Sequence, residues 1–344
     1  MKKFLSAIAA LSVLTAALAG CGSSASTTTT TATTTAAATA AVTEAAAQGS
    51  EYKVAIVQQL DHTSLDEIRL AMEAELDKKA AEKGITITYK EFNGQNDATV
   101  LNQIGAQVVS DQYDAILPIA TLAATTMATA TEENRIPVIY AAISDPASSD
   151  LTGIPNVTGT SDALNTQFIL DMMLAAQPDI ETVGLLYSNS EVNSVTPIAE
   201  AKAYLDSKGI AYLEKTGNST DEILTAASAM VGRVQAVFTP TDNVVMAAAS
   251  AVAEILTDAG IPHYTGADSF VTAGAFTTCG VNYTELGTYT ADMAVDILLG
   301  GAIPEYHVMD GGIITVNTDT AKALGIDYSV FSTMAGTVKE VTTE

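Results

Sequence analysis

Short apolar runs alternate with helical stretches through most of this chain, and the same order of elements occurs twice. Apolar strands separated by helices are typical of βαβ units and of a parallel sheet. Lys83-Gly84-Ile85 recurs as Lys208-Gly209-Ile210, and Ile136-Pro137 recurs as Ile261-Pro262, both at an offset of 125 residues. We therefore predict an α/β fold with two doubly wound parallel-sheet lobes, joined by hinge strands, with a ligand cleft between them.

The expected elements of the two copies correspond to one another. In the first copy we expect strands over residues 54–57, 85–89, 115–118 and 137–142, with helices over 64–83, 97–110 and 122–133. In the second copy we expect strands over 183–187, 212–215, 234–238 and near 263, with helices over 196–207, 221–231 and 243–256. Ser64-Leu65-Asp66-Glu67 has the pattern of a capping box, and Gly84 is the expected end of that helix.

The first fifty residues differ from the rest. Lys2 and Lys3 precede a largely apolar run that ends in Leu18-Ala19-Gly20-Cys21, which indicates a signal peptide over residues 1–20. The ending is similar to a bacterial lipobox, which implies cleavage before Cys21 and a lipid on its sulfur; an ordinary signal peptide that ends near a cysteine is the alternative. Residues 21–50 contain mainly Ser, Thr, Ala and Gly and are expected to be a flexible tether.

The remaining residues are numerous enough for two cores. We assign 51–159 plus 282–310 to the first lobe and 160–281 plus 311–340 to the second, with a helix over 286–299 and a strand near 313–316. The net charge of −25 argues against nucleic acid and anionic membrane surfaces as partners. Only two cysteines, Cys21 and Cys279, are present, so no intramolecular disulfide is expected once Cys21 carries a lipid.

Polar turns follow the strands of both copies. In Thr239-Pro240-Thr241-Asp242-Asn243 an apolar run ends and a helix begins, so Thr241 or Asp242 is the expected N-cap. Pro118-Ile119-Ala120-Thr121 is the counterpart in the first copy, at an offset of 122 residues. Because ligands of open α/β sheets bind beyond the carboxyl ends of the strands, these turns are expected to line the cleft.

The order and the amino-acid sequences of these turns resemble those of the TrpX-like ABC transporter substrate-binding lipoprotein family, which has the type I periplasmic-binding fold. The matching strings cover nearly all of residues 52–330, and Tyr187–Ser194 and Pro240–Asn243 are the most specific of them. The others are Ile119-Ala120-Thr121, Ile143-Ser144-Asp145-Pro146, Gly184-Leu185-Leu186 and Gly280-Val281-Asn282-Tyr283-Thr284-Glu285-Leu286-Gly287. Where the family often has His-Pro after its first strand, this chain has His62-Thr63.

The resemblance implies capture of a small solute, with an aromatic amino acid as the expected ligand. Carried over by position, the ligand-binding residues are His62, Thr121, Ser144, Asp145, Asn189, Glu191, Asn193, Thr241, Asp242, Asn243, Asp268 and Tyr283. Thr121 and Ser144 suit a carboxylate at a helix N-terminus, and Asp242, Asn189 or Asp268 suits an ammonium group. Tyr140, Tyr187, Tyr283 or Phe270 is expected to supply an apolar wall.

We therefore expect an extracytoplasmic solute-binding lipoprotein of an ABC importer that closes its lobes around an amino acid. A membrane permease, and the membrane itself through the lipid on Cys21, are the expected partners of a monomer. We expect no cofactor, no metal and no enzymatic activity, because the nucleophile, phosphate-loop and zinc motifs are absent. A ligand-sensing subunit that signals to a membrane receptor is the alternative function, and a branched-chain amino acid is the alternative ligand.

Overall fold

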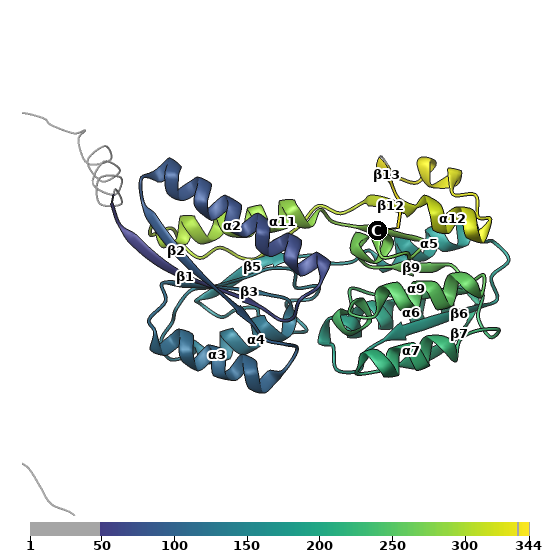
Figure 1. Ribbon diagram of the computed structural model, residues 1–344, viewed down its shortest axis with the longest axis horizontal. Coiled ribbons are helices and arrows are strands. Elements are labelled where there is room, and N and C mark those ends of the chain that lie inside the picture. The colour runs from purple at the N-terminus through teal and green to yellow at the C-terminus, as the bar shows by residue number, and fades with distance from the viewer. Residues whose placement is uncertain (1–48, 336, 344) are drawn as a thin grey trace, which may run out of the picture. The chain divides into compact units, whose positions relative to one another are not determined.

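The computed structural model describes residues 49–335 and 337–343, and these residues belong to one compact unit (Figure 1). The expected signal peptide, Cys21 and most of the tether lie outside the described residues. Within the described ranges, no helix combines the length and the apolar character needed to cross a membrane.

The first sheet has six strands in the order β11-β5-β4-β3-β1-β2, and all its pairings are parallel. Its strands are β1 (Glu51–Gln58), β2 (Thr86–Asn93), β3 (Ala115–Ile119), β4 (Val138–Tyr140), β5 (Val157–Ser161) and β11 (His307–Val308). The helices on this sheet are α2 (Thr63–Lys83), α3 (Ala98–Ser110), α4 (Thr121–Ala130) and α11 (Tyr283–Leu298). We call this sheet and these helices the first lobe.

Both faces of the first sheet are covered by helices, as the uninterrupted apolar run along β1 requires. Val54 and Ile56 pack in the cluster that contains α2 and α11, while Ala55 and Val57 pack in the cluster that contains α3 and α4. In Figure 1, α2 and α11 lie along one face of the sheet and α3 and α4 along the other. A parallel sheet covered on both faces explains why residues 54–57 of β1 are apolar at every position.

The second sheet has seven strands in the order β13-β12-β10-β9-β8-β6-β7, and only the β10–β12 pair is antiparallel within the described residues. The strands are β6 (Thr182–Tyr187), β7 (Ala211–Thr216), β8 (Ala236–Thr239), β9 (His263–Thr265), β10 (Thr277–Gly280), β12 (Ile313–Asn317) and β13 (Thr337–Val341). The helices are α5 (Thr166–Ala176), α6 (Val195–Lys208), α7 (Thr220–Ser228), α8 (Asn243–Met246), α9 (Ala249–Asp258), α10 (Asp268–Thr272) and α12 (Thr318–Leu324). Two short 3-10 helices are η1 (Val192–Ser194) and η2 (Ser329–Thr333). These elements form the second lobe.

The two copies share backbone details that their sequences predict. Gly84 and Gly209 both end their helices in the left-handed conformation, with φ of 65° and 69°. The carbonyl of Pro137 accepts from the amide of Ile116 at 2.9 Å, and the carbonyl of Pro262 accepts from the amide of Val237 at 3.0 Å.

The chain passes between the sheets in three short segments, after Ser161, after Gly280 and after Val308. This supports the division into two lobes, and we propose these three segments as the hinge.

Several elements differ from those expected. The expected helix over 243–256 is two helices, α8 and α9, because every residue of α8 is buried and tertiary packing positions that segment. The capping box at Ser64 does not form: α2 begins after His62, which makes no side-chain cap. The sequence also did not indicate β5, α5 or β13. In β5 the reason is its composition, since this strand is rich in threonine and serine yet fully buried.

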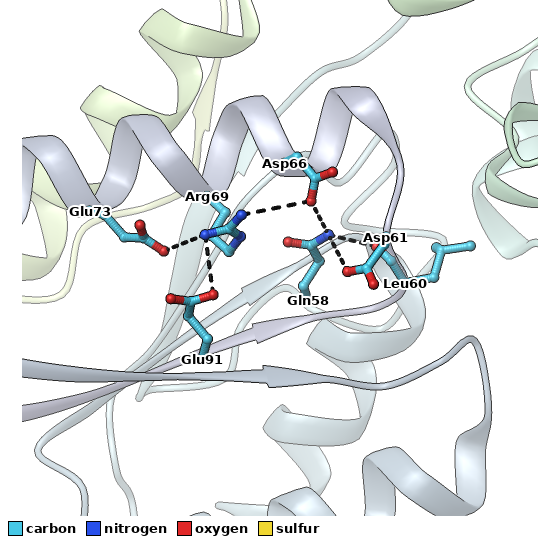
Figure 2. A network of polar contacts seen from close by, with 7 residues as sticks. All are labelled: Gln58, Leu60, Asp61, Asp66, Arg69, Glu73 and Glu91. Carbon is cyan, nitrogen blue, oxygen red and sulfur yellow. Dashed lines mark hydrogen bonds and ion pairs between the residues drawn. The ribbon is translucent and has the colours of Figure 1, made fainter.

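A polar network fixes the turn between β1 and α2 (Figure 2). Gln58 Nε2 donates to the carbonyl of Leu60 at 2.8 Å and to Asp66 Oδ1 at 2.9 Å. Arg69 lies 2.8 Å from Glu73, 3.2 Å from Glu91 and 4.0 Å from Asp66. The network joins β1, β2 and α2, and it holds the turn that carries His62 and Ser64.

We expect Arg69→Ala to lower the free energy of unfolding by about 1–2 kcal/mol, because three carboxylates lose their shared cation. Chemical denaturation monitored by circular dichroism measures this change. Lys78→Ala is the matched control on the same helix, since Lys78 is exposed and pairs with Glu75 alone. Equal losses in the two variants would contradict a special role for the Arg69 network.

Candidate functional site

A small cavity lies where the polar strand ends of the two lobes meet, and it has a volume of about 30 Å³. Its lining residues come from the turns after β1, β3, β4, β5, β6, β8, β9 and β10 and from the helices that follow them. They are His62, Ser64, Leu65, Ala120, Thr121, Ala142, Ser144, Asp162, Asn193, Thr241, Asp242, Asn243, Met246, Ala267, Phe270 and Tyr283. This space holds about one or two water molecules, so the lobes are closed on each other.

Most of the residues expected to bind a ligand are brought together here. His62, Thr121, Ser144, Asn193, Thr241, Asp242, Asn243 and Tyr283 line the cavity. Glu191 lies behind the lining, where Asn243 Nδ2 donates to its Oε2 at 2.6 Å.

Three expected residues lie elsewhere. Asp145 accepts from Thr196 Oγ1 at 2.7 Å, Asn189 donates to Thr216 Oγ1 at 3.0 Å, and Asp268 pairs with Lys339 at 3.6 Å. The structure thus gives each of them a protein partner away from the cavity.

Asp242 has a different role from the one expected of an ammonium ligand. One oxygen accepts from the amide of Val245 at 2.9 Å, which makes Asp242 the N-cap of α8. The other oxygen accepts from the amide of Ser188 and from Ser194 Oγ, both at 2.7 Å. These bonds lie within the second lobe, so the carboxylate positions the turn after β8 and has little capacity left for a solute.

Asp162, which sequence reasoning missed, is the better candidate for an ammonium ligand. It is buried at the end of β5, where Ser144 Oγ donates to it at 3.0 Å and Tyr283 Oη at 3.2 Å. None of the ion pairs in the described part of the chain includes Asp162. Burial raises its pKa, and a cation in the cavity would stabilise its charged form.

The N-terminus of α4 opens on the cavity and suits an anion. Ala120, its N-cap, has φ of 75° and ψ of 164°, a region that residues other than glycine rarely occupy. Ala120 makes no side-chain cap, and Gln59 Oε1 accepts from the amide of Leu122 at 2.9 Å. Ala120 and Thr121 line the cavity, so the start of α4 and the hydroxyl of Thr121 lie at a site that can hold a carboxylate.

Another part of the cavity lining is apolar. Leu65, Met246, Ala267 and Phe270 line it, together with the ring of Tyr283. Phe270 and Tyr283 therefore lie where an apolar wall for the side chain of the solute is expected. The other two candidates do not: Tyr140 is fully buried in the core beside α3 and α4, and Tyr187 donates to Glu214 at 2.8 Å.

Side chains of the two lobes contact one another directly around the cavity. Gln59 Nε2 donates to Glu191 Oε1 at 3.1 Å, and Ser144 Oγ lies 2.9 Å from Thr241 Oγ1. His62 Nε2 lies 3.0 Å from Asn243 Oδ1. Because Asn243 gives its amino group to Glu191, its oxygen accepts and His62 carries the proton on Nε2. Burial lowers the pKa of His62, which keeps the ring neutral.

Residues 53–337 match the family model of the ABC transporter substrate binding protein. The curated tyrosine-binding protein of Clostridioides difficile (strain R20291) is 30% identical over 278 residues, which are 79% of this chain and 80% of that protein. The crystal structure of the ABC domain in complex with L-Trp from Streptococcus pneumonia has a TM-score of 0.77 and 30% identity, covering 84% of this chain and 100% of that chain.

A ligand-free, open structure of a substrate-binding protein with adhesive properties from Clostridium difficile aligns with a TM-score of 0.64. It is 31% identical and covers 85% of this chain and 100% of that chain. At nearly equal identity, the described residues thus align better with the tryptophan complex than with the open form.

Fold and cleft together define a two-lobed binding protein of the type I periplasmic class, as the sequence predicted. The chain belongs to the ABC transporter substrate binding protein family. Its function as a substrate-binding component of an ABC transporter, which is not a catalytic component, follows from that membership, and nothing favours the sensing alternative.

We expect the stability of the protein to fall with rising pH because of Glu191. Burial, and secondarily the nearby Asp242, raise the pKa of Glu191 to about 7 from an ordinary value of 4.5. The folded state therefore holds a proton that the unfolded state releases, so the contribution of Glu191 to stability is fully present below pH 4.5 and is lost as pH rises through 7. Thermal unfolding from pH 5 to pH 8 measures this, with Glu191→Gln as the comparison.

The glutamine variant keeps the size of the side chain and one acceptor oxygen, replaces the second acceptor with an amino group, and cannot ionise, so its melting temperature should fall less over this range. Asp162 and Asp242 contribute similar trends in both proteins, because burial raises the pKa of each. Only the difference between wild type and variant reports Glu191. Parallel profiles would contradict the prediction.

Proposed function

We propose that this protein captures an aromatic amino acid outside the cytoplasm and delivers it to the permease of an ABC importer. The observation that carries the proposal is the buried carboxylate of Asp162, which faces the cavity without a cationic partner among the described residues. A free amino group supplies that cation. The curated relative that binds tyrosine and the structure that holds L-Trp support an aromatic side chain.

The three parts of such a solute match three parts of the cavity. Its ammonium group pairs with Asp162, and its carboxylate accepts from the hydroxyl and the amide of Thr121 at the start of α4. Its ring packs against Phe270, Met246 and Leu65. Ser144 lies between the two charged groups, since its hydroxyl contacts both Asp162 and Thr241.

Capture occurs by hinge closure. With the lobes apart, the strand ends are hydrated and the solute enters; on closure the side chains around the cavity meet and water leaves. A cavity of about 30 Å³ is too small for an aromatic amino acid, so the bound form is slightly more open than this one. The solute replaces part of the direct contact between the lobes.

The protein acts at the membrane surface, next to the permease. A lipid on Cys21 holds the protein at the membrane, and the tether over 22–50 gives the lobes reach. The protein acts as a monomer without cofactor or catalytic activity, and the closed lobes together form the surface that docks on the permease.

We expect isothermal titration of the Glu51–Glu344 fragment to detect tight binding of Tyr, Trp or Phe, and not of leucine, nucleosides or sugars. Asp162→Asn should weaken this binding by at least a hundredfold, because the variant loses the charge that pairs with the ammonium group. Asp258→Asn, an exposed change on α9, is the matched control and should bind normally. Exclusive binding of sugars, or unchanged affinity in Asp162→Asn, would overturn the assignment.

A further inference from the structure

Two serine hydroxyls meet at the apolar part of the cavity lining, one from each lobe. Ser64 lies in the first turn of α2 and lines the cavity, and Ser269 lies in the first turn of α10. Their hydroxyl groups are hydrogen-bonded to each other, and each residue is only 4% exposed. Their neighbours are apolar, since Leu65 and Phe270 are adjacent in the chain and Met246 Sδ lies 3.5 Å from Ser269 Oγ.

This pair does not use its full capacity for hydrogen bonds. Two hydroxyls offer two donors and four lone pairs. Within the described residues, these side chains make the bond to each other and one weak contact to the sulfur of Met246. Buried hydroxyls with spare lone pairs in apolar surroundings are unfavourable unless a further donor is present.

Neither serine is needed to start its helix. The N-cap of α2 is His62 and the N-cap of α10 is Ala267, and both lack a side-chain cap. Ser64 occupies the position where the sequence predicts a capping box, but its hydroxyl is directed to the other lobe instead. Local helix chemistry therefore does not account for these two hydroxyls.

The orientation of the solute brings the far end of its ring to this pair. With the ammonium group at Asp162 and the carboxylate at α4, the side chain extends towards Leu65, Met246 and Phe270. A para-hydroxyl there can donate to one serine and accept from the other. One bond between the serines is then replaced by two bonds to the solute, and the hydroxyl bridges α2 and α10.

We propose that Ser64 and Ser269 recognise the phenolic hydroxyl of the solute, so that the protein selects tyrosine over phenylalanine. This inference rests on the proposed capture of an aromatic amino acid and names its preferred member. It assigns specificity to two residues whose hydroxyls, among the described residues, bond only to each other and to the sulfur of Met246. Because the hydroxyl joins the lobes, selection and closure are the same event.

Titration calorimetry with tyrosine, phenylalanine, 4-fluorophenylalanine and tryptophan tests the proposal. The fluoro compound fills the para position but cannot donate a hydrogen bond. We expect wild type to bind tyrosine at least fivefold more tightly than the other three, since one additional hydrogen bond contributes about that factor.

Ser64→Ala and Ser269→Ala should each reduce the preference for tyrosine over phenylalanine to less than twofold. The change should come from weaker binding of tyrosine, with the affinity for phenylalanine unchanged within twofold. Ser332→Ala is the matched control, because Ser332 is an exposed serine of the second lobe whose hydroxyl bonds to the carbonyl of Ser329. This variant should keep the preference of wild type.

Failure of the tyrosine preference and failure of the proposed capture give different results. Equal affinity of wild type for tyrosine and phenylalanine, tighter binding of tryptophan than of tyrosine, or an unchanged preference in both alanine variants would overturn this inference while the proposed capture stands. A wild type that binds none of the four amino acids would overturn both.

Discussion

Buried polar side chains at the ends of the strands must find hydrogen-bond partners, and this requirement governs how the two lobes meet. Gln59 satisfies the amide of Leu122 in its own lobe and Glu191 in the other, while Asn243 joins Glu191 to His62. With the lobes apart, water would serve the same groups. Since closure exchanges one set of hydrogen bonds for another, its net free energy is small. A solute that bonds to both lobes can therefore shift the equilibrium towards the closed form.

The charges around the cavity impose a second condition. Asp162, Glu191 and Asp242 are all buried here, while no lysine or arginine lines the cavity. Burial of like charges is unfavourable, and the environment of each carboxylate offsets this in a different way. Asp242 is held by amides and a hydroxyl, Glu191 takes up a proton, and Asp162 is left for a cation from outside. This arrangement supports our proposal of a solute with an amino group rather than a neutral sugar.

The sequence predicted the features that arise from local chemistry. The repeated Lys-Gly-Ile and Ile-Pro strings correspond to equivalent helix ends and equivalent backbone bonds, because a left-handed glycine and a strand-end proline have the same local geometry in each copy. Asp162 was missed since β5, which ends one residue before it, has a polar sequence and is a strand only because the rest of the sheet surrounds it. Asp145 and Asn189 lie in strand-end turns as expected, yet their side chains bond to Thr196 of α6 and Thr216 of β7. Which way a turn residue points depends on tertiary contacts that spacing does not encode.

The difference between the two copies at one aligned position explains why the solute's carboxylate is assigned to the first lobe. Ala120 and Asp242 correspond in the duplication, and each is the N-cap of the helix that follows its strand. Asp242 supplies a carboxylate to the amides of α8, so that helix N-terminus is already neutralised by its own lobe. Ala120 has no such group and adopts a backbone conformation that alanine disfavours, which leaves the start of α4 open to the cavity. One copy therefore has an aspartate at this helix N-terminus, and in the other copy the same position is available for the carboxylate of the solute that we propose.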